Sequence, residues 1–166
     1  MFQPLPPLFL ERLKKIYSDD ELQIIESGYA TPKRNPVFRI HTTQQENIEY
    51  TLAELKEKEL NIKPLSFLNQ AYILENGTEK DLWDLQCYTN GWIYLQGITS
   101  QIPVNLLKNY LETENLSKDN LKIIDLAAAP GGKTSQLATL GTENHIIASE
   151  LSTIRAEKLR YNLKKL

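Results

Sequence analysis

Apolar residues at the start of the chain recur with the spacing of a helix. After two prolines, the apolar side chains Phe9, Leu13, Ile16 and Tyr17 stand among charged ones. A second helix is expected to begin at residues 18–20, whose polar side chains can cap free N–H groups, and to end before Gly28. The first thirty residues therefore predict two short helices.

Between residues 36 and 98 the pattern changes to short strands around one helix. Residues 36–42 (PVFRIHT) predict a strand, and Thr43 with Glu46 forms a capping box ahead of a helix. That helix carries Ile48, Leu52 and Leu55. Residues 62–74 are apolar but contain Pro64, which predicts extended segments at a sheet edge. Residues 91–97 (GWIYLQG) predict another short strand between glycines.

The last third of the chain alternates strands with helices. Pro103 suits the first turn of a helix whose apolar side carries Ile102, Leu106, Tyr110 and Leu111. The polar spacer ETENLSKDN follows it. The pattern then predicts a strand at 121–126, a helix at 133–140, a strand at 145–149 and a helix at 152–166. Such alternation is typical of a parallel sheet with right-handed crossovers.

Several apolar side chains are expected in the core. The last helix is predicted to bury Ala156, Leu159, Leu163 and Leu166. Among the aromatic residues, Trp83, Trp92, Tyr94 and Phe67 are interpreted as core residues and not as platforms for stacking bases. Cys87 is interpreted as a packing residue, because a free cysteine behaves as a small apolar side chain.

Composition narrows the class of protein. A chain of 166 residues with 41% hydrophobic residues can build a globular core, and a net charge of −2 creates no overall attraction to nucleic acid. One cysteine and two scattered histidines, His41 and His145, predict neither a disulfide nor a structural metal site. The N-terminus has three prolines and Glu11 in place of a leader, and no apolar run is long enough to cross a bilayer. We therefore expect a cytoplasmic protein with no membrane partner.

The most informative segment is residues 121–133 (LKIIDLAAAPGGK). An apolar run ends at Asp125, a loop of small residues with two glycines follows, and a second apolar run ends at Glu150, 25 positions after Asp125. Glycines let backbone N–H groups approach a ligand, the next helix presents its positive N-terminus to an anion, and the second acid can accept from a ribose diol. This pattern predicts a nucleotide-type cofactor site.

A phosphate-binding loop is the rival interpretation of the same segment. Ala127, followed after four residues by Gly132, Lys133 and Thr134, fits a degenerate form of that motif. Against it, Pro130 lacks an N–H group in a loop that works through successive N–H donors, and Ala127 lacks the conformational freedom of glycine. This alternative predicts magnesium-dependent binding of a nucleoside triphosphate.

The loop and its neighbours resemble a known family. Residues 125–138 (DLAAAPGGKTSQLA) and 149–163 (SELSTIRAEKLRYNL) resemble the first and second motifs of the Sun/Fmu (Nop/Sun) family of RNA cytosine-5 methyltransferases. Residues 91–104 are similar to the segment just upstream in that family, although Gly97 stands where an acid is common. Residues 34–42 are similar to its arginine-bearing strand, with His41 in place of the usual Asn.

The resemblance implies an α/β fold and a cofactor. A small N-terminal α+β domain, residues 1–98, would precede the start of a Rossmann-like class I methyltransferase sheet, two strands and two helices in residues 99–166. S-adenosylmethionine would be bound by Ala127, Ala128, Ala129, Pro130, Gly131, Gly132 and Lys133, with Glu150 on the ribose hydroxyls. Asp125 would order the loop or a water by the methionine ammonium, and Lys133 would neutralise an anionic group of the cofactor or of RNA.

The resemblance also implies a substrate and an incomplete site. The substrate would be RNA, and more narrowly ribosomal RNA. The family's nucleophilic cysteine lies far downstream of the cofactor loop, so no catalytic residue is assigned in this sequence. We expect the chain to be inactive alone and to need a C-terminal half of the catalytic domain or an oligomeric partner. A non-catalytic RNA-binding or scaffolding fragment remains the alternative from another class.

The final helix carries a net positive charge. Its charged side chains are Arg155, Lys158, Arg160, Lys164 and Lys165 against Glu157. A solvated helix face explains this charge by default, and a local RNA-binding patch is the second interpretation.

Overall fold

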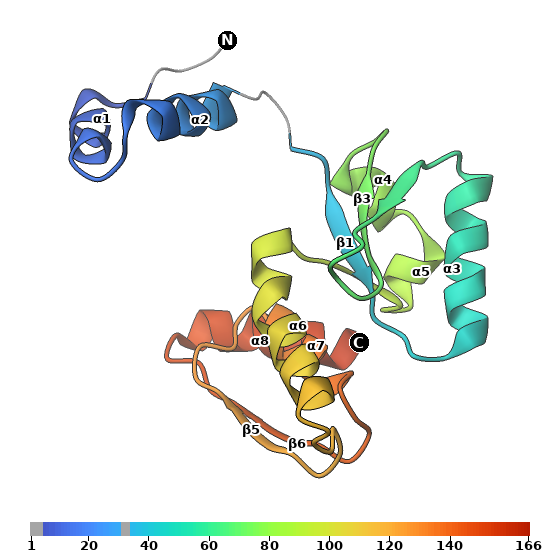
Figure 1. Cartoon of the computed structure of the whole chain (residues 1–166). Coiled ribbons are helices and arrows are strands. Elements are labelled where there is room, and N and C mark those ends of the chain that lie inside the picture. Colours follow the sequence, from blue (N-terminus) through green and yellow to red (C-terminus); the bar gives the residue numbers. More distant parts are fainter. Residues whose placement is uncertain (1–4, 31–33) are drawn as a thin grey trace. The chain divides into compact units, whose positions relative to one another are not determined.

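The computed structural model describes residues 5–30 and 34–166, which belong to two compact units, residues 1–34 and residues 35–166 (Figure 1). The first unit contains the two predicted helices, α1 (Pro7–Lys14) and α2 (Asp19–Ala30). Ser18 caps α2 as predicted, since its Oγ accepts from the N–H of Glu21 at 3.4 Å, and its own N–H donates to Glu21 Oε2 at 2.8 Å. The predicted end before Gly28 is wrong, because α2 continues to Ala30. A glycine inside a helix costs about 1 kcal/mol, which does not suffice to end it.

The second unit begins with a four-stranded antiparallel sheet. Its strands are β1 (Val37–Ile40), β2 (Ile62–Pro64), β3 (Ala71–Leu74) and β4 (Ile93–Leu95), in the order β2-β3-β1-β4. Pro64 lies on the edge strand β2, as its missing N–H group predicts. The strand β3 is different: it pairs with both β2 and β1 and is therefore not an edge strand.

Three helices accompany this sheet: α3 (Gln45–Glu57), α4 (Glu79–Trp83) and α5 (Gln86–Thr89). The predicted capping box of Thr43 and Glu46 does not form, because α3 has Gln44 at its N-cap and no side chain caps it. A capping box forms at α4 instead, where the N–H and hydroxyl of Thr78 both donate to Asp81 Oδ2, at 2.7 and 2.8 Å. The capping-box pattern in the sequence alone therefore does not fix where a helix starts.

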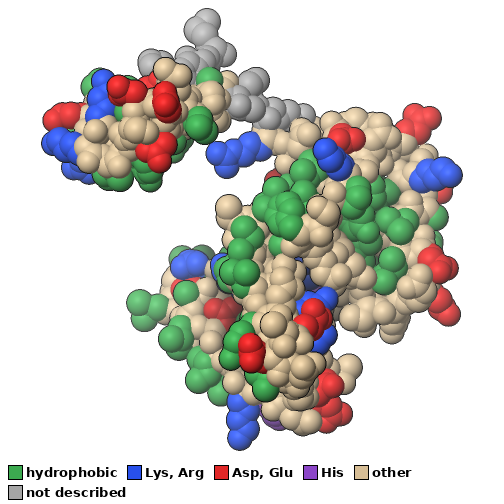
Figure 2. Space-filling model, in the orientation of Figure 1, with side chains coloured by type: hydrophobic (Ala, Val, Ile, Leu, Met, Phe, Trp, Pro, Cys, Tyr) green, Lys and Arg blue, Asp and Glu red, His purple; other side chains and the backbone are tan. Residues whose placement is uncertain are grey.

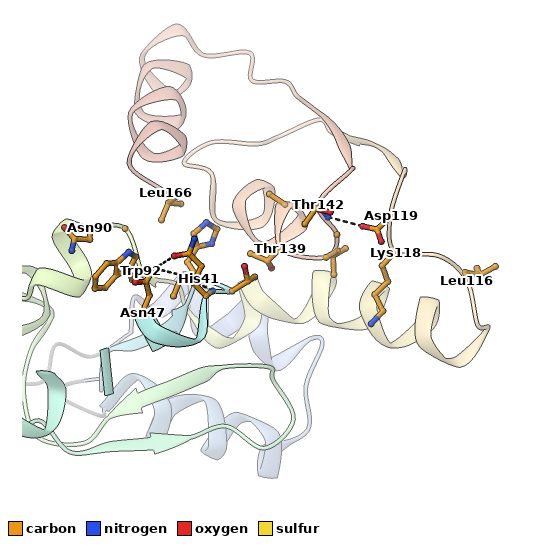
Figure 3. Close-up of a pocket in the computed structure, with 17 residues that line it drawn as sticks. His41, Asn47, Asn90, Trp92, Leu116, Lys118, Asp119, Thr139, Thr142 and Leu166 are labelled. Carbon is orange, nitrogen blue, oxygen red and sulfur yellow. Dashed lines mark hydrogen bonds between the residues drawn. The ribbon is translucent and has the colours of Figure 1, made fainter. Parts of the chain in front are cut away.

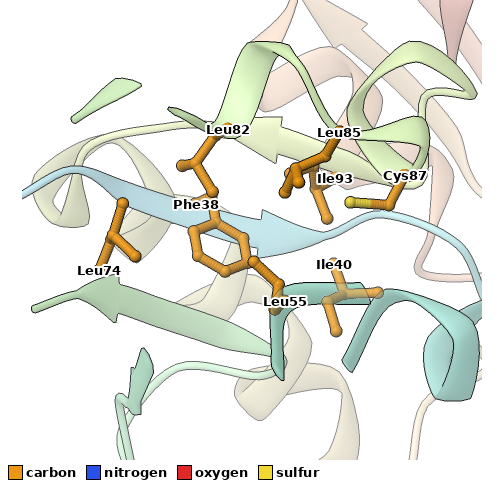
Figure 4. Packing of buried hydrophobic residues seen from close by; sticks show 8 residues of the cluster. All are labelled: Phe38, Ile40, Leu55, Leu74, Leu82, Leu85, Cys87 and Ile93. Carbon is orange, nitrogen blue, oxygen red and sulfur yellow. The ribbon is translucent and has the colours of Figure 1, made fainter. Parts of the chain in front are cut away.

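The main core lies between this sheet and the three helices (Figure 4). Its buried members are Phe38, Ile40, Leu55, Leu74, Leu82, Leu85, Cys87 and Ile93. Cys87 is confirmed as a packing residue, and burial together with a hydrogen bond to Glu54 raises the pKa of its thiol to about 12.

Two of the four aromatic residues predicted for the core lie elsewhere. Trp92 packs partly buried against the core, and Tyr94 is also half-buried. Phe67 is 56% exposed in the turn between β2 and β3, and Trp83 is exposed at the last position of α4. Their prediction as core residues is wrong. Phe67 lies in a turn and Trp83 at the end of a short helix, where no other described element covers the rings.

The sixth helix, α6 (Ile98–Thr113), begins earlier than predicted and buries a different side from the predicted one. It begins five positions before Pro103, which lies inside the helix and not in its first turn. The buried residues are Gln101, Val104 and Leu111, whereas Leu106 and Tyr110 of the predicted apolar side are exposed. Apolar residues occupy two sides of this helix, so periodicity alone could not select the side that packs.

The last part of the unit is the predicted alternation of strands and helices. The strands β5 (Lys122–Asp125) and β6 (His145–Ala148) pair in parallel, and the helices are α7 (Gly132–Ala138) and α8 (Thr153–Lys165). In α8 Leu159 is buried as predicted, while Leu163 is exposed. Among the described residues, no helix combines the length and apolar character needed to span a membrane.

The division predicted between residues 98 and 99 falls at the start of α6. The antiparallel sheet precedes it and the parallel pair follows it, and both belong to the compact unit of residues 35–166. The division into two domains stays a prediction.

The strand β1 contacts both the core of the antiparallel sheet and the helix α7. Alternation along a strand sends Phe38 and Ile40 into the core and Arg39 to the opposite face. There Arg39 Nη2 donates to Ser135 Oγ at 2.6 Å and to the Gly132 carbonyl at 3.3 Å, both in α7. Arg39 Nη1 lies 2.8 Å from Nδ1 of His41. Burial and the nearby Arg39 charge lower the pKa of His41 to about 4.

The first prediction concerns the core. Phe38→Ala should lower the free energy of unfolding by about 3–5 kcal/mol, because the fully buried ring also stacks on Tyr72. Phe67→Ala makes the same change at an exposed ring and should alter stability by less than about 0.5 kcal/mol. Urea unfolding followed by circular dichroism measures both. Equal losses in the two variants would contradict the described packing.

The second prediction concerns pH. The pKa of His41 is 6.5 in the unfolded chain and about 4 in the folded chain. As the pH falls, the unfolded chain therefore binds the proton first. The stability of the wild type should therefore fall as the pH drops through this window. His41→Asn removes the titrating group and should flatten that part of the curve. Urea titrations across the window test it, and parallel curves for the two proteins would refute the assignment.

Candidate cofactor site

The loop predicted to bind a cofactor lies at the carboxyl edge of the parallel pair. It joins the end of β5 to the start of α7, and Glu150 follows the end of β6. Parallel strands bring their carboxyl ends to one edge of a sheet. The N–H of Ala128 accordingly donates to the carbonyl of Ser149 at 3.0 Å, and that of Ala129 to Glu150 Oε2 at 3.3 Å. The structure therefore brings the loop and the second acid together.

Asp125 orders the loop through two hydrogen bonds. Its Oδ2 accepts from the hydroxyl of Thr134 at 2.7 Å, and its Oδ1 accepts from the N–H of Ala127 at 3.4 Å. These bonds tie the end of β5 to the first turn of α7. The arrangement agrees with the loop-ordering role expected for Asp125.

Side chains of the protein bind three carbonyls of this segment. Arg155 Nη2 donates to the Ala129 carbonyl at 2.8 Å, and Asn162 Nδ2 to the Pro130 carbonyl at 2.7 Å. The third is the Gly132 carbonyl, which accepts from Arg39. The sequence interpretation missed Arg155 and Asn162 as loop partners. Their helical spacing of seven positions is the one signal that places both on the same face of α8.

Both glycines of the loop are crowded by the protein itself. Gly131 has φ 109°, a left-handed conformation that favours glycine, and an added Cβ would lie 3.1 Å from Leu159 of α8. At Gly132 an added Cβ would lie 3.3 Å from both Tyr94 and Gln96. Packing inside the protein thus explains these residues, and their contact with a cofactor stays a prediction.

A cavity of about 220 Å³ lies against the loop. Six of the predicted cofactor residues line it: Ala127, Ala128, Ala129, Pro130, Gly132 and Lys133. Its other wall is residues 94–97 and Ser100, and Lys133 Nζ lies 3.4 Å from Ser100 Oγ. Gly131 and Glu150 do not line it. The cavity is smaller than the roughly 300–1,000 Å³ of typical ligand pockets, so it has room for part of a cofactor.

Glu150 is anchored by the protein. Its side chain is 4% exposed, and Oε1 accepts from the N–H of Ser152 at 3.1 Å and lies 3.4 Å from Arg155 Nη1. The hydrogen bond from Ser152 and the charge of Arg155 hold the pKa of Glu150 below its usual value. The carboxylate is therefore ionised at neutral pH. Its contact with a ribose stays a prediction.

Three N–H groups of the loop are already bound within the protein. The N–H groups of Ala128 and Ala129 donate to Ser149 and Glu150, and that of Gly131 donates to the Ala128 carbonyl at 2.7 Å. A phosphate-binding loop keeps such groups for the ligand. The geometry therefore disfavours the phosphate-binding alternative.

A larger cavity lies away from the loop (Figure 3). Its volume is about 860 Å³, and its walls include His41 and Trp92 on one side and Lys118 and Thr142 on the other. Lys118 precedes β5 and Thr142 precedes β6, so this cavity lies near the amino ends of the parallel strands. The cofactor loop lies at their carboxyl ends. Across residues 5–30 and 34–166, no three His, Cys, Asp or Glu side chains form a metal site.

Comparisons with known proteins agree with the motif. Residues 113–166 match the family model of 16S rRNA methyltransferase RsmB/F. The chain is 30% identical over 162 residues to ribosomal RNA small subunit methyltransferase B of Yersinia enterocolitica, an alignment that covers 97% of this chain and 34% of the relative. The chain thus spans about a third of the length of such relatives.

Solved structures share the fold. The crystal structure of NSun6 from Pyrococcus horikoshii with SFG matches with a TM-score of 0.73 and 18% identity, over 97% of this chain and 62% of that one. A methyltransferase homolog protein from the same organism matches with a TM-score of 0.67 and 26% identity, over 98% of this chain and 54% of that one. The predicted resemblance is therefore confirmed: the chain has the fold and motifs of the N-terminal part of Sun-type, RsmB/F-like RNA methyltransferases.

Proposed function

We propose that this chain is the N-terminal part of an S-adenosylmethionine-dependent RNA cytosine-5 methyltransferase that acts on ribosomal RNA. The observation that carries the proposal is the loop of residues 127–133, ordered beside Glu150 at the carboxyl edge of a parallel pair. The relative from Yersinia enterocolitica is named as a ribosomal RNA methyltransferase, which supports the substrate class.

The cofactor would supply the reactive methyl group, and residues 127–133 with Glu150 would hold it. The Pyrococcus NSun6 structure contains SFG, an analogue of S-adenosylmethionine, which supports this choice. Asp125, Arg155 and Asn162 keep the loop in place through its backbone. Their role would be to pre-order the site, because a loop already in its bound conformation loses less entropy on binding.

The chain is proposed to be inactive by itself. Cys87 is fully buried, and its thiol has a pKa near 12, so it stays protonated and cannot attack a cytosine. The nucleophile would come from outside this sequence.

A second polypeptide segment is proposed to cover the parallel pair. Ile124 and Ile147 are paired neighbours on one face of the β5–β6 sheet and are 62% and 65% exposed. Figure 2 shows exposed hydrophobic side chains on this unit. Parallel sheets are normally covered on both faces. The covering segment would be a C-terminal half of the catalytic domain or a second chain.

The third prediction tests the cofactor. Calorimetry should show saturable binding of S-adenosylhomocysteine to the wild type, and Gly132→Asp should abolish it by filling the space beside Tyr94 and Gln96. Gly28→Asp is the matched control, because an added Cβ there meets nothing within 4 Å. Glu150→Gln nearly keeps the shape and should weaken binding about tenfold or more, the usual loss for a hydrogen bond to a charged group.

Three results would count against this function. The wild type could bind no S-adenosylhomocysteine, it could bind only ATP with magnesium, or Gly28→Asp could lose as much affinity as Gly132→Asp. Binding of ribosomal RNA without methyl transfer, even after a C-terminal half is added, would favour the non-catalytic scaffolding alternative.

The fourth prediction tests the exposed face. The wild type should self-associate over a concentration series in analytical ultracentrifugation, and Ile147→Lys should reduce this association by placing a charge on the apolar face. Ile24→Lys is the control, since Ile24 is similarly exposed but lies on α2. A wild type that stays a stable monomer throughout would contradict the proposed cover.

A further inference from the structure

Arg39 is a buried cation with neutral partners. Its side chain is 2% exposed, and burial lowers its pKa to about 10, so the guanidinium remains charged at neutral pH. In the described part of the chain its acceptors are an amide oxygen, an imidazole nitrogen, a hydroxyl and a backbone carbonyl. A buried charge without a carboxylate depends on every one of these groups.

The antiparallel sheet fixes one side of the guanidinium. Tyr94 is the cross-strand neighbour of Arg39, and the guanidinium carbon lies 5.3 Å from the centre of its ring. Arg39 Nε donates to Gln96 Oε1 at 2.9 Å, and Gln96 Nε2 in turn donates to the Ser100 carbonyl at 3.1 Å. His41 binds Nη1, so partners outside α7 already fix the orientation of the guanidinium.

The other side of the guanidinium binds the end of the cofactor loop. Arg39 Nη2 donates to the Gly132 carbonyl and to Ser135 Oγ, and the Ser135 hydroxyl lies 3.2 Å from the same carbonyl. Gly132 directly follows Gly131, the left-handed residue at which the loop turns into α7. If the loop moved, the buried cation would lose two of its acceptors.

We propose that Arg39 is a positioning residue for the cofactor loop. It acts through the Gly132 carbonyl and the Ser135 hydroxyl and contacts no cofactor itself. The antiparallel sheet thereby holds the loop in its binding conformation, so that the sheet is a working part of the cofactor site. The functional consequence rests on the function proposed above, whereas the loop-ordering effect can be measured without any ligand.

Lysine is the informative replacement. It keeps the positive charge and the long stem, but one ammonium nitrogen cannot reproduce the planar fork that reaches Gln96, His41 and Ser135 together. Arg39→Lys should therefore loosen the loop without removing the charge.

The fifth prediction is tested by amide hydrogen exchange in the ligand-free chain. Arg39→Lys should speed exchange of the Gly131 and Ala128 amides about tenfold more than exchange of the Leu74 amide, which donates to Pro36 in the antiparallel sheet. Leu55→Ala is the control for lost stability, because Leu55 of α3 is buried in the core. In that variant the three amides should change together.

Cofactor affinity is the second measurement. If the loop is ordered only about a tenth of the time in Arg39→Lys, affinity for S-adenosylhomocysteine should fall about tenfold. The affinity of Leu55→Ala, measured where it is folded, should not change. Uniform exchange changes in Arg39→Lys, or an unchanged affinity, would overturn the positioning role. Absence of binding by the wild type would instead overturn the proposed function and leave the exchange result to decide the role of Arg39.

Discussion

The second unit depends on the side-chain alternation of one short strand. Because successive residues of β1 face opposite sides, the strand contributes Phe38 and Ile40 to the apolar core and Arg39 to the contact with α7. The sheet hydrogen bonds that fix the register of β1 against β3 and β4 also fix the guanidinium. A one-residue slip would exchange the two faces, placing the charge in the apolar core and Phe38 among the polar partners of Arg39.

The cofactor loop is held by partners from distant parts of the sequence. Arg39 reaches it from β1, Asp125 from β5, and Arg155 with Asn162 from α8. The partners satisfy carbonyls and N–H groups that a loop of small residues cannot satisfy by itself. Gly131 and Gly132 are needed because side chains such as Leu159 and Tyr94 come close to them.

The two faces of the parallel pair are unequal. Ile123 and Ile146 are half-buried, whereas Ile124 and Ile147 on the other face are mostly exposed. The same asymmetry extends to Leu151, which follows Glu150 and is fully exposed. The uncovered face thus offers apolar area to a further segment.

The sequence by itself determined the last strands and helices and the motif, whereas the short helices α4 and α5 were not predicted. The alternation of strands and helices after residue 121, the acids Asp125 at the end of β5 and Glu150 just after β6, and the resemblance of the loop could all be predicted, because each depends on local spacing. The positions of Pro64 at an edge and of Ser18 at a helix start were readable for the same reason.

Tertiary structure decided what each side chain does. The packed side of α6, the exposure of Phe67 and Trp83, and the failed cap at Thr43 all depend on which elements lie opposite, which local spacing does not encode. The burial of Arg39 is the clearest case. Along the chain it was only a member of a predicted strand, and the approach of α7, more than ninety positions away, added the Gly132 and Ser135 acceptors.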